Sequence, residues 1–201
     1  MFSMIEKATG RVRRPTGARA EAREQAILDA ALELLMEVGY DRLSIDALAE
    51  QAKAGKATIY RHWSGKAQVV AEAIRRRKCE HTEQVPDTGS LRGDLLSALD
   101  QMSASITADE AIIAGVMSAM RTDPELAGLM RTEVLNNRGN LDGIIQRAVR
   151  RGELPDGSRA ELLYEVVPAV VMHRLVLWGE PTGNEFTTHL VDDIVLPLLR
   201  L

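Results

Sequence analysis

Apolar residues recur every three or four positions along most of this chain, a spacing that predicts amphipathic helices. The first clear helix is followed by Gly39, a residue that favours a helix C-terminal cap. No segment shows the strict alternation that marks a strand, so we predict an all-α fold of about nine helices. The apolar face of the first helix consists of Ile27, Ala30, Ala31, Leu34, Leu35 and Val38.

Two short helices are predicted after this first one. Ser44 is the expected N-cap of the first, and a break at Lys53–Gly55 separates it from the second, Lys56–Trp63. Ile59 and Trp63 lie four positions apart, so both can anchor the second helix to a core. Two short helices joined by a tight turn and packed on a preceding helix have the outline of a helix-turn-helix.

Helices are also expected across the remainder of the chain. Ser90 is a candidate N-cap, and Asp123-Pro124-Glu125 combines a cap, a first-turn proline and an acid in the order that favours a helix start. Asn136, Asn137 and Gly139 weaken the helix that begins there, so we expect a bend or break in its middle. The expected helices occupy, in outline, 66–78, 90–106, 112–120, 124–151, 160–178 and 184–199.

The composition is that of a folded, helix-rich chain. Of the 201 residues, 45% are hydrophobic but only 3% aromatic, which argues against a sandwich or barrel. Cys79 is the single cysteine, so no disulfide can form within the chain, and we expect a reducing, cytoplasmic location. Met1–Arg19 lacks the apolar run of a secretory signal. The longest apolar stretch, Leu162–Trp178, contains charged residues and is short for a bilayer, so we expect no membrane partner.

Charge is distributed unevenly along the chain. Residues 1–80 hold 15 Lys and Arg against 11 Asp and Glu, whereas residues 81–201 hold 10 against 18. This asymmetry indicates a polyanionic partner for the N-terminal part only. We interpret residues 1–18 as a flexible basic arm, which is either an idle terminus or an added attraction to phosphates.

The second short helix is unusually rich in hydrogen-bond donors. Gly55 and Ala57 are small residues at its start, where a helix can approach a major groove closely. Donor side chains beside them can reach phosphates and base edges. These donors are Lys56, Thr58, Tyr60, Arg61 and His62.

Three segments together match the sequence pattern of one known family. They are Val38-Gly39-Tyr40, Ser44–Ala49 and Gly55–Trp63, and Lys66 follows shortly after the third segment. Over residues 22–74 the chain closely resembles the DNA-binding domain of the tetracycline-repressor-like (TetR) family of bacterial transcriptional regulators. That family's turn normally reads Ala-Gly-Val-Ser, whereas this chain has Ala-Lys-Ala-Gly, so Lys53 stands where the turn glycine is expected. A left-handed lysine costs about 1 kcal/mol. We therefore expect a slightly altered turn that still permits DNA binding.

The resemblance implies a helix-turn-helix DNA-binding domain at 19–66 and a helical bundle for ligand binding and dimerisation at 67–201. It places Lys56, Ala57 and Tyr60 where family members touch bases. Further positions then correspond to phosphate contacts, namely Thr58, Arg61, His62 and Lys66.

Some of these positions have alternative roles. Ser44, at the start of the preceding helix, fits a phosphate contact through its hydroxyl and the helix dipole as well as a cap. Tyr60 can instead serve packing, and Arg61 can be a solvated charge or can bind guanine through two hydrogen bonds.

A helix-turn-helix reads only a few base pairs, so a homodimer on a palindromic operator in double-stranded DNA is expected. The helices Ala160–Trp178 and Glu185–Leu199 are the most apolar, and the resemblance implies that such helices form a four-helix bundle across the dimer. The alternative is that their apolar residues fill the core of one subunit. The candidates are Leu162, Val166, Val170, Leu175, Leu190, Ile194 and Leu198.

The resemblance also implies an unidentified small-molecule effector that binds the C-terminal half and releases the DNA. Methionines suit an adaptable apolar pocket, although core packing is the alternative for each of them. His173 beside Arg174 could hold an acidic or carbonyl ligand, or this pair could form a buried ion pair with Glu165 or with an acid elsewhere. The candidate ligand residues are Met102, Met117, Met120, Met130, His173 and Trp178.

No other chemistry is supported by a motif. The segment Ala54–Thr58 suggests a phosphate-binding loop. However, Glu50 occupies the position where that motif requires its first glycine, and no predicted strand precedes the segment. Cys79 and His81 are close, but the remaining histidines are scattered, so we expect no metal and no cofactor. We therefore predict a DNA-binding regulator, most simply a repressor, and no catalytic residues. The alternatives are a DNA-binding module without an effector, and a helical enzyme or protein-interaction module.

Overall fold

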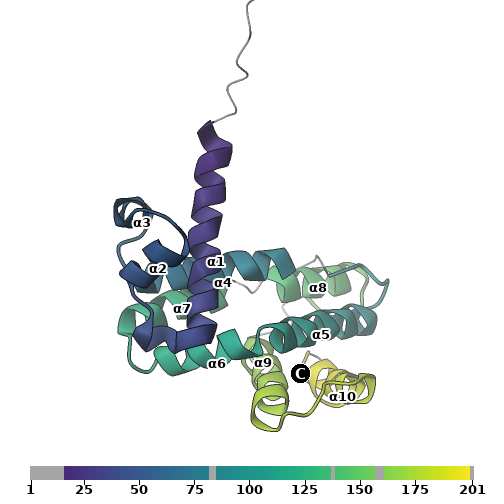
Figure 1. The fold of residues 1–201 in the computed structure, drawn as a ribbon. Coiled ribbons are helices and arrows are strands. Elements are labelled where there is room, and N and C mark those ends of the chain that lie inside the picture. The colour runs from purple at the N-terminus through teal and green to yellow at the C-terminus, as the bar shows by residue number, and fades with distance from the viewer. Residues whose placement is uncertain (1–15, 82–84, 137–138, 157–160, 200–201) are drawn as a thin grey trace, which may run out of the picture.

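The computed structural model describes residues 16–81, 85–136, 139–156 and 161–199, and within these ranges the only regular structure is helical (Figure 1). None of the helices in these ranges combines the length and apolar character needed to cross a membrane. The first eight helices are α1 (Thr16–Arg42), α2 (Ile45–Gln51), α3 (Lys56–His62), α4 (Lys66–His81), α5 (Leu91–Ala108), α6 (Glu110–Ala119), α7 (Pro124–Asn136) and α8 (Gly139–Arg150). Two composite helices follow: α9 (Leu163–Met172) continues into the π-helical η1 (His173–Leu177), and α10 (Asn184–His189) continues through the π-helical η2 (Leu190–Val195) into α11 (Leu196–Leu199).

The all-α prediction is confirmed, and the described ranges contain ten helices where about nine were expected. The predicted helix 124–151 corresponds to α7 and α8, and the bend or break expected in its middle falls on residues 137–138, outside the described ranges. The first helix also begins earlier than expected. It starts at Thr16, so the last three residues of the predicted arm are helical, and strong helix formers such as Ala18 and Ala20 explain the extension. Residues 1–15 lie outside the described ranges.

Two capping predictions are confirmed by hydrogen bonds. The Oγ atom of Ser90 accepts the amide of Gly93 at 3.1 Å, at the start of α5. A carboxylate oxygen of Asp123 accepts the amides of Glu125 at 2.9 Å and Leu126 at 3.0 Å, at the start of α7. Gly39 takes the positive φ expected of a C-terminal cap (76°), and this residue interrupts α1 near its end.

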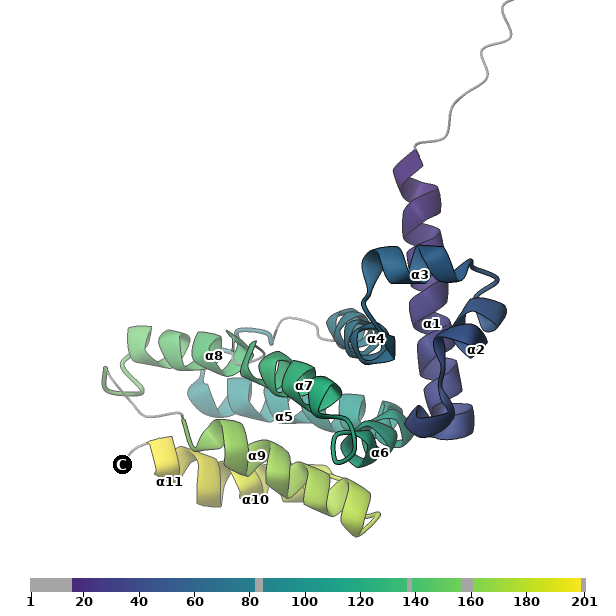
Figure 2. The same ribbon diagram turned by 90° about the vertical axis from the view of Figure 1, so that its left-hand side faces the viewer.

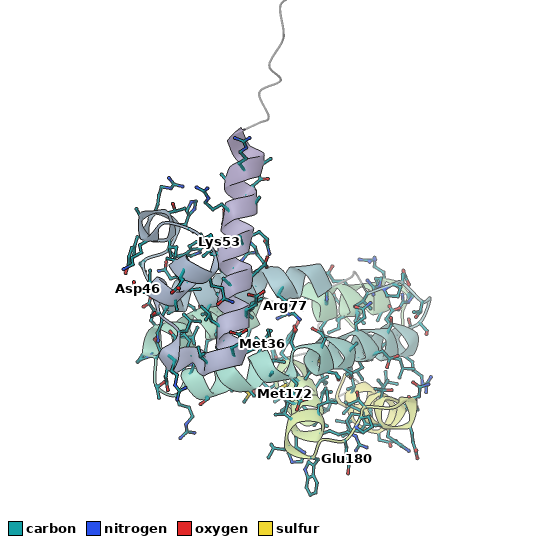
Figure 3. The ribbon with its side chains drawn as sticks, viewed as in Figure 1. Met36, Asp46, Lys53, Arg77, Met172 and Glu180 are labelled. Carbon is teal, nitrogen blue, oxygen red and sulfur yellow. The ribbon has the colours of Figure 1, made fainter. Side chains whose placement is uncertain are left out.

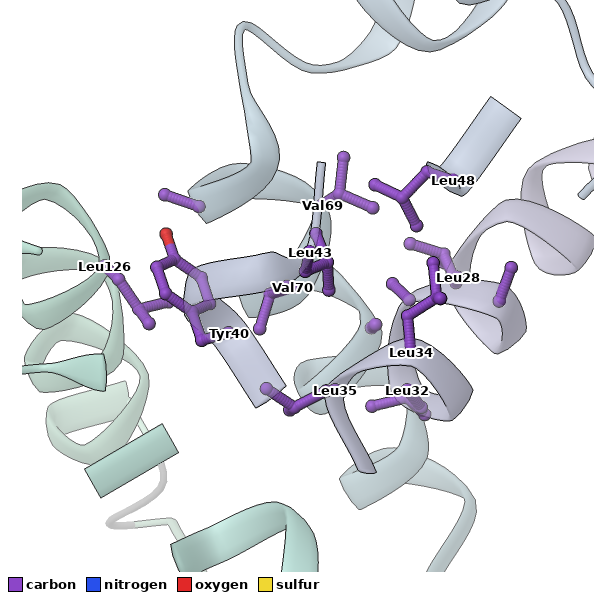
Figure 4. Packing of buried hydrophobic residues seen from close by; sticks show 14 of the residues in the cluster. Leu28, Leu32, Leu34, Leu35, Tyr40, Leu43, Leu48, Val69, Val70 and Leu126 are labelled. Carbon is purple, nitrogen blue, oxygen red and sulfur yellow. The ribbon is translucent and has the colours of Figure 1, made fainter. Parts of the chain in front are cut away.

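The first of two hydrophobic cores holds the helix-turn-helix together. Ile27, Leu48 and Ile59 are fully buried in it, so α1, α2 and α3 share one apolar centre. Residues of α4, α6 and α7 complete this core, among them Leu126, whose side chain lies beside that of Tyr40 (Figure 4). The helix-turn-helix elements are therefore packed directly on part of the C-terminal half.

The second core lies among α5, α8, α9 and the last helix. Ile144, Val171 and Val191 are fully buried there. Seen from the side, α9, α10 and α11 lie at the opposite end of the molecule from α3 (Figure 2). Because α4 packs on both α1 and α7, it connects the helix-turn-helix to the remainder of the chain.

A buried acidic residue, Asp94, joins α5 to α8. The backbone amide and Oγ1 of Thr88 donate to one of its oxygens at 2.8 and 2.7 Å, and Arg147 and Arg151 donate to the other at 3.1 Å each. Burial alone would raise the pKa of Asp94, but these four hydrogen bonds outweigh it and lower the pKa to about 2. Asp94 is therefore ionised and fully partnered at neutral pH.

Candidate nucleic-acid interface

The turn between α2 and α3 has the geometry that a helix-turn-helix requires. Ser44 caps α2, because its Oγ accepts the amide of Ala47 at 3.2 Å. At the other end of α2, the amide of Lys53 donates to Glu50 at 3.2 Å and the amide of Ala54 donates to Ala49 at 2.9 Å. This pair of bonds is a Schellman motif, which needs a left-handed residue at the position of Lys53.

Lys53 takes that left-handed conformation, with φ 48°, and is the only non-glycine residue with positive φ in the described ranges. The same motif ends α8, where Glu153 donates to Ala148, Gly152 donates to Val149, and Gly152 has φ 76°. The lysine therefore occupies a glycine position, as the sequence predicted, and the turn closes with both expected hydrogen bonds. Figure 3 shows Lys53 and Asp46 on this part of the molecule.

The α3 helix presents its polar residues outward. Ile59 is fully buried and Trp63 is 7% exposed, so the two predicted anchors hold the inner face of α3 against the first core. On the outer face Lys56, Ala57 and Tyr60 are exposed. Arg61 and His62 are exposed as well, and Thr58 is half-buried. The predicted base- and phosphate-contacting residues of α3 thus share one accessible surface.

Lys56 carries the clearest electrostatic feature of this surface. Its Nζ lies 2.7 Å from Oδ1 of Asp46 on α2, and both side chains are largely exposed. The hydrogen bond to Asp46, followed by the charge of Asp46, raises the pKa of Lys56. Lys56 is therefore a full cation that is paired within the protein when no DNA is bound.

Lys66 is differently placed from the other predicted phosphate contacts. It is half-buried, its Nζ donates to the backbone oxygen of Tyr40 at 2.9 Å, and the same atom lies 4.3 Å from the centre of the Tyr40 ring. Its charge is therefore held against the end of α1. Ser44, in contrast, is exposed, and its hydroxyl hydrogen stays available while its oxygen caps α2.

Two arginines that the motif did not include lie beside the recognition surface. Arg19 and Arg23 of α1, together with Arg61 and His62 of α3, line a small cleft of about 260 Å³. The two α1 residues are four positions apart, so they share a helix face. The four-residue spacing of Arg19 and Arg23 could have indicated a basic helix face in the sequence. These arginines were not predicted as site residues because the first helix was expected to begin later.

Family models match both halves of the chain. One, described as bacterial regulatory proteins of the tetR family, matches residues 27–73, and another, described as a tetracyclin repressor-like C-terminal domain, matches residues 85–194. The chain belongs to the TetR family. It is accordingly a DNA-binding transcriptional regulator of the helix-turn-helix type, as its sequence indicated.

Relatives of this TetR-family chain cover nearly its whole length. The chain is 36% identical over 185 residues to the DNA-binding transcriptional repressor TetR of Mycobacteroides abscessus, a match that spans 91% of this chain and 97% of the relative. It is 33% identical over 201 residues to the HTH-type transcriptional regulator Rv1556 of Mycobacterium tuberculosis, covering 98% of both.

Solved structures share the fold. The TetR family transcription regulator SCO0332 matches with a TM-score of 0.68 and 24% identity, over 91% of this chain and 100% of that one. The regulator FadR from Bacillus subtilis, solved in complex with stearoyl-CoA, matches with a TM-score of 0.65 and 18% identity, over 87% of this chain and 96% of that one.

The ligand residues expected from sequence do not converge on one place in this TetR-family chain. Met130 is buried and Met120 partly buried against the first core, because α7 and the end of α6 pack on the helix-turn-helix. Met102 packs on the second core, and Met117 is 55% exposed on α6. His173 and Trp178 do meet, since the indole nitrogen donates to Nε2 of His173 at 3.1 Å. Trp178 is nevertheless 67% exposed.

The dimer candidates divide into two groups. Leu162 is 61% exposed and Ile194 is 39% exposed, and the neighbouring Leu177 and Trp178 are more exposed still. Leu190 is instead only 3% exposed, because η2 turns that side chain into the second core. Val170, Leu175 and Leu198 are partly buried against that core, and Val166 is half-buried. The predicted helix start at Ala160 lies outside the described ranges, and α9 begins at Leu163.

Proposed function

We propose that this chain is a homodimeric repressor that binds a palindromic operator and is released from it by a small-molecule effector in the cytoplasm. The outward surface of α3 supports the DNA-binding part most directly, because its donors are exposed while Ile59 and Trp63 hold the helix rigidly. The relative in Mycobacteroides abscessus, named as a transcriptional repressor, supports repression.

In this proposal α3 enters the major groove of the operator. Lys56, Ala57 and Tyr60 contact bases, and the remaining predicted donors of α3, with Ser44 and Lys66, contact phosphates. Arg19 and Arg23 add phosphate contacts from α1, because they flank Arg61 and His62. Lys56 must then exchange its bond to Asp46 for a bond to DNA.

The proposed dimer uses the end of the molecule opposite α3. Leu162, Leu177, Trp178 and Ile194 are exposed apolar side chains carried by the two composite helices and the residues that flank them. Their contact with a second copy removes apolar surface from water. Such a dimer places two α3 helices on half-sites, which explains why the operator is expected to be palindromic.

The effector part of the proposal is supported by the Bacillus subtilis FadR, a structure of similar fold that contains stearoyl-CoA. A ligand releases DNA only if it binds the DNA-free conformation more tightly than the bound one.

The proposal is tested by selecting binding sites from random duplex DNA with the purified full chain at a stated salt concentration, since affinity depends strongly on salt. Enrichment of an inverted repeat is the expected result. Lys56→Ala combined with Tyr60→Ala should then abolish specific binding, while the exposed Arg131→Ala on α7 is the matched control and should leave it unchanged. Failure to enrich any sequence from the ligand-free protein contradicts the proposal, and unchanged affinity in the double variant contradicts the assigned contacts.

A further inference from the structure

A cleft of about 670 Å³ lies far from α3, between the end of α5 and the loop that follows η1. One wall is formed by residues 100–110 and the other by Leu175 and residues 179–182. Figure 3 shows Glu180 at this lower end of the molecule. We refer to this feature as the α5–η1 cleft. Its volume falls within the range of sites for small organic molecules.

The α5–η1 cleft is acidic. Asp100, Glu110 and Glu180 line it. Glu180 is paired with Arg174, whose Nη2 lies 3.1 Å from its Oε2. Arg174 is held in place, since its Nε also donates to the oxygen of Pro181 and its guanidinium lies over the ring of Phe186. Within the described ranges, no ion pair or side-chain hydrogen bond neutralises Asp100 or Glu110. The cleft therefore retains two uncompensated negative charges.

A buried hydroxyl gives a second, independent indication of a ligand. Ser103 lines the cleft and is 6% exposed, yet its Oγ has no hydrogen-bond partner among the described residues. Serines within helices commonly satisfy this atom with the carbonyl four residues earlier, and buried hydroxyls are rarely left unpaired. The neighbouring Thr107 is already satisfied, because its Oγ1 donates to the backbone oxygen of Ser103 at 2.9 Å. Ser103 thus leaves one buried hydrogen-bonding group unused at the wall of the cleft.

Part of the lining is apolar. Ile106, Ala108, Leu175 and Pro181 provide it. An occupant that suits this surface has an apolar body, and the two free carboxylates require that it carries positive charge. A carboxylate or phosphate would meet repulsion from Asp100 and Glu110.

We propose that the α5–η1 cleft binds a small organic cation, an ammonium or amidinium with an apolar body. Its charged group lies against the carboxylate lining of Asp100 and Glu110, and its hydrogen-bonding atoms face Ser103. That this molecule is the effector rests on the function proposed above.

The position of the cleft gives the bound cation a route to the DNA-binding helices. Asp109, next to Glu110, accepts a hydrogen bond from Arg77 of α4 at 2.5 Å. The helix α6, which begins at the cleft, packs on α1, with Gly115 beside the side chain of Leu35. A shift of the first turn of α6 toward the cation therefore acts on both α4 and α1.

Titration calorimetry on the full chain tests the binding directly, without DNA. The probe is 4-phenylbutylammonium, compared with 4-phenylbutyrate and 4-phenylbutanol, which share its apolar body. The ammonium should bind at least about tenfold more tightly than either of the others. Asp100→Asn combined with Glu110→Gln should remove about tenfold or more of that affinity, and Ser103→Ala should lower it severalfold.

The matched control is Glu37→Gln combined with Asp156→Asn, which removes the same charge at two exposed positions outside the cleft and should bind the ammonium as the natural sequence does. Equal affinity for the ammonium and the carboxylate, or an unchanged affinity in the cleft double variant, overturns the proposal. The two proposals fail separately. If DNA selection yields an operator but the ammonium does not bind, only the cleft assignment is wrong. If the ammonium binds as stated but no operator is found, only the DNA-binding proposal is wrong.

Discussion

The hydroxyl of Tyr40 donates a hydrogen bond of 2.5 Å to Oδ2 of Asp123, a residue 83 positions away. Tyr40 lies at the end of α1, and Asp123 caps α7 with its other oxygen. Burial, then the hydrogen bond and charge of Asp123, raise the pKa of Tyr40, so the phenol stays protonated at any physiological pH. One hydrogen bond thus connects the DNA-binding helices to the C-terminal half.

Tyr40→Phe should lower the free energy of unfolding by about 1 kcal/mol, because it removes this hydrogen bond and leaves the packing of the ring intact. Asp123→Ala should cost about 2 kcal/mol, since the α7 cap is lost as well. Chemical denaturation at fixed protein concentration measures both. Tyr60→Phe is the matched control, because that exposed hydroxyl bonds to no other described residue, and it should leave stability unchanged. If Tyr60→Phe lowers the free energy of unfolding as much as Tyr40→Phe does, the hydrogen bond between Tyr40 and Asp123 contributes nothing to stability.

Lys53→Gly should raise the free energy of unfolding by about 1 kcal/mol, because glycine adopts a positive φ without a steric penalty. Gly152→Lys should lower it by a similar amount, since that glycine has the same place in the same motif. Lys53→Ala separates conformation from charge: it keeps a Cβ at the left-handed position and should give no stabilisation. If alanine stabilises as much as glycine, the strain is not in the backbone.

Asp94 should make the chain less stable in acid. Its pKa is about 2 in the folded protein against an ordinary 3.8. The stabilisation, about 2 kcal/mol, is thus complete above about pH 4 and is lost as the pH falls toward 2. Denaturation at pH 5, 4 and 3 should show that Asp94→Asn is less stable than the natural sequence at pH 5. Its free energy of unfolding should also fall less than that of the natural sequence as the pH is lowered. The exposed Asp156→Asn should follow the natural sequence at each pH.

Arg19→Ala combined with Arg23→Ala should weaken DNA binding to a similar degree on operator and random DNA, because phosphate contacts carry no sequence information. The slope of log affinity against log salt concentration should become shallower by about one to two units. A preference for a different base in the double variant would place these arginines in a groove instead of on the backbone.

Ile194→Asp combined with Leu162→Asp should convert the proposed dimer to a monomer, since two charges would be buried at an apolar contact. Sedimentation equilibrium measures the mass. Val134→Asp, an exposed apolar residue of α7 (62%), is the control and should stay dimeric. A natural chain that sediments as a monomer at all concentrations would remove the basis for a palindromic operator.

The helix-turn-helix was predictable because its determinants are local. Ser44 caps, Lys53 turns the chain, and Ile59 with Trp63 anchors α3, each within a few residues of the next. Apolar spacing and cap chemistry record such features directly in the sequence.

Features that depend on distant partners were not predictable in this way. The α5–η1 cleft joins residues near Ser103 to a loop near Glu180, and on its own helix Asp100 has the pattern of a solvated charge. Leu190 and Leu162 belong to equally apolar helices, yet only the packing of η2 decides that Leu190 is buried and Leu162 exposed. Methionine positions are uninformative for the same reason, because Met130 reaches the first core only through the packing of α7.

The ion pair between Lys56 and Asp46 affects how the protein distinguishes one DNA sequence from another. In the proposed complex with DNA, Lys56 leaves Asp46, and the freed carboxylate then faces a polyanion. A base with well-placed acceptors compensates for that loss, whereas a base without them does not. With Lys56 at a base as proposed, Asp46 would weaken binding to the many wrong sites of a chromosome more than binding to the right one, and it would shorten the time spent on each wrong site.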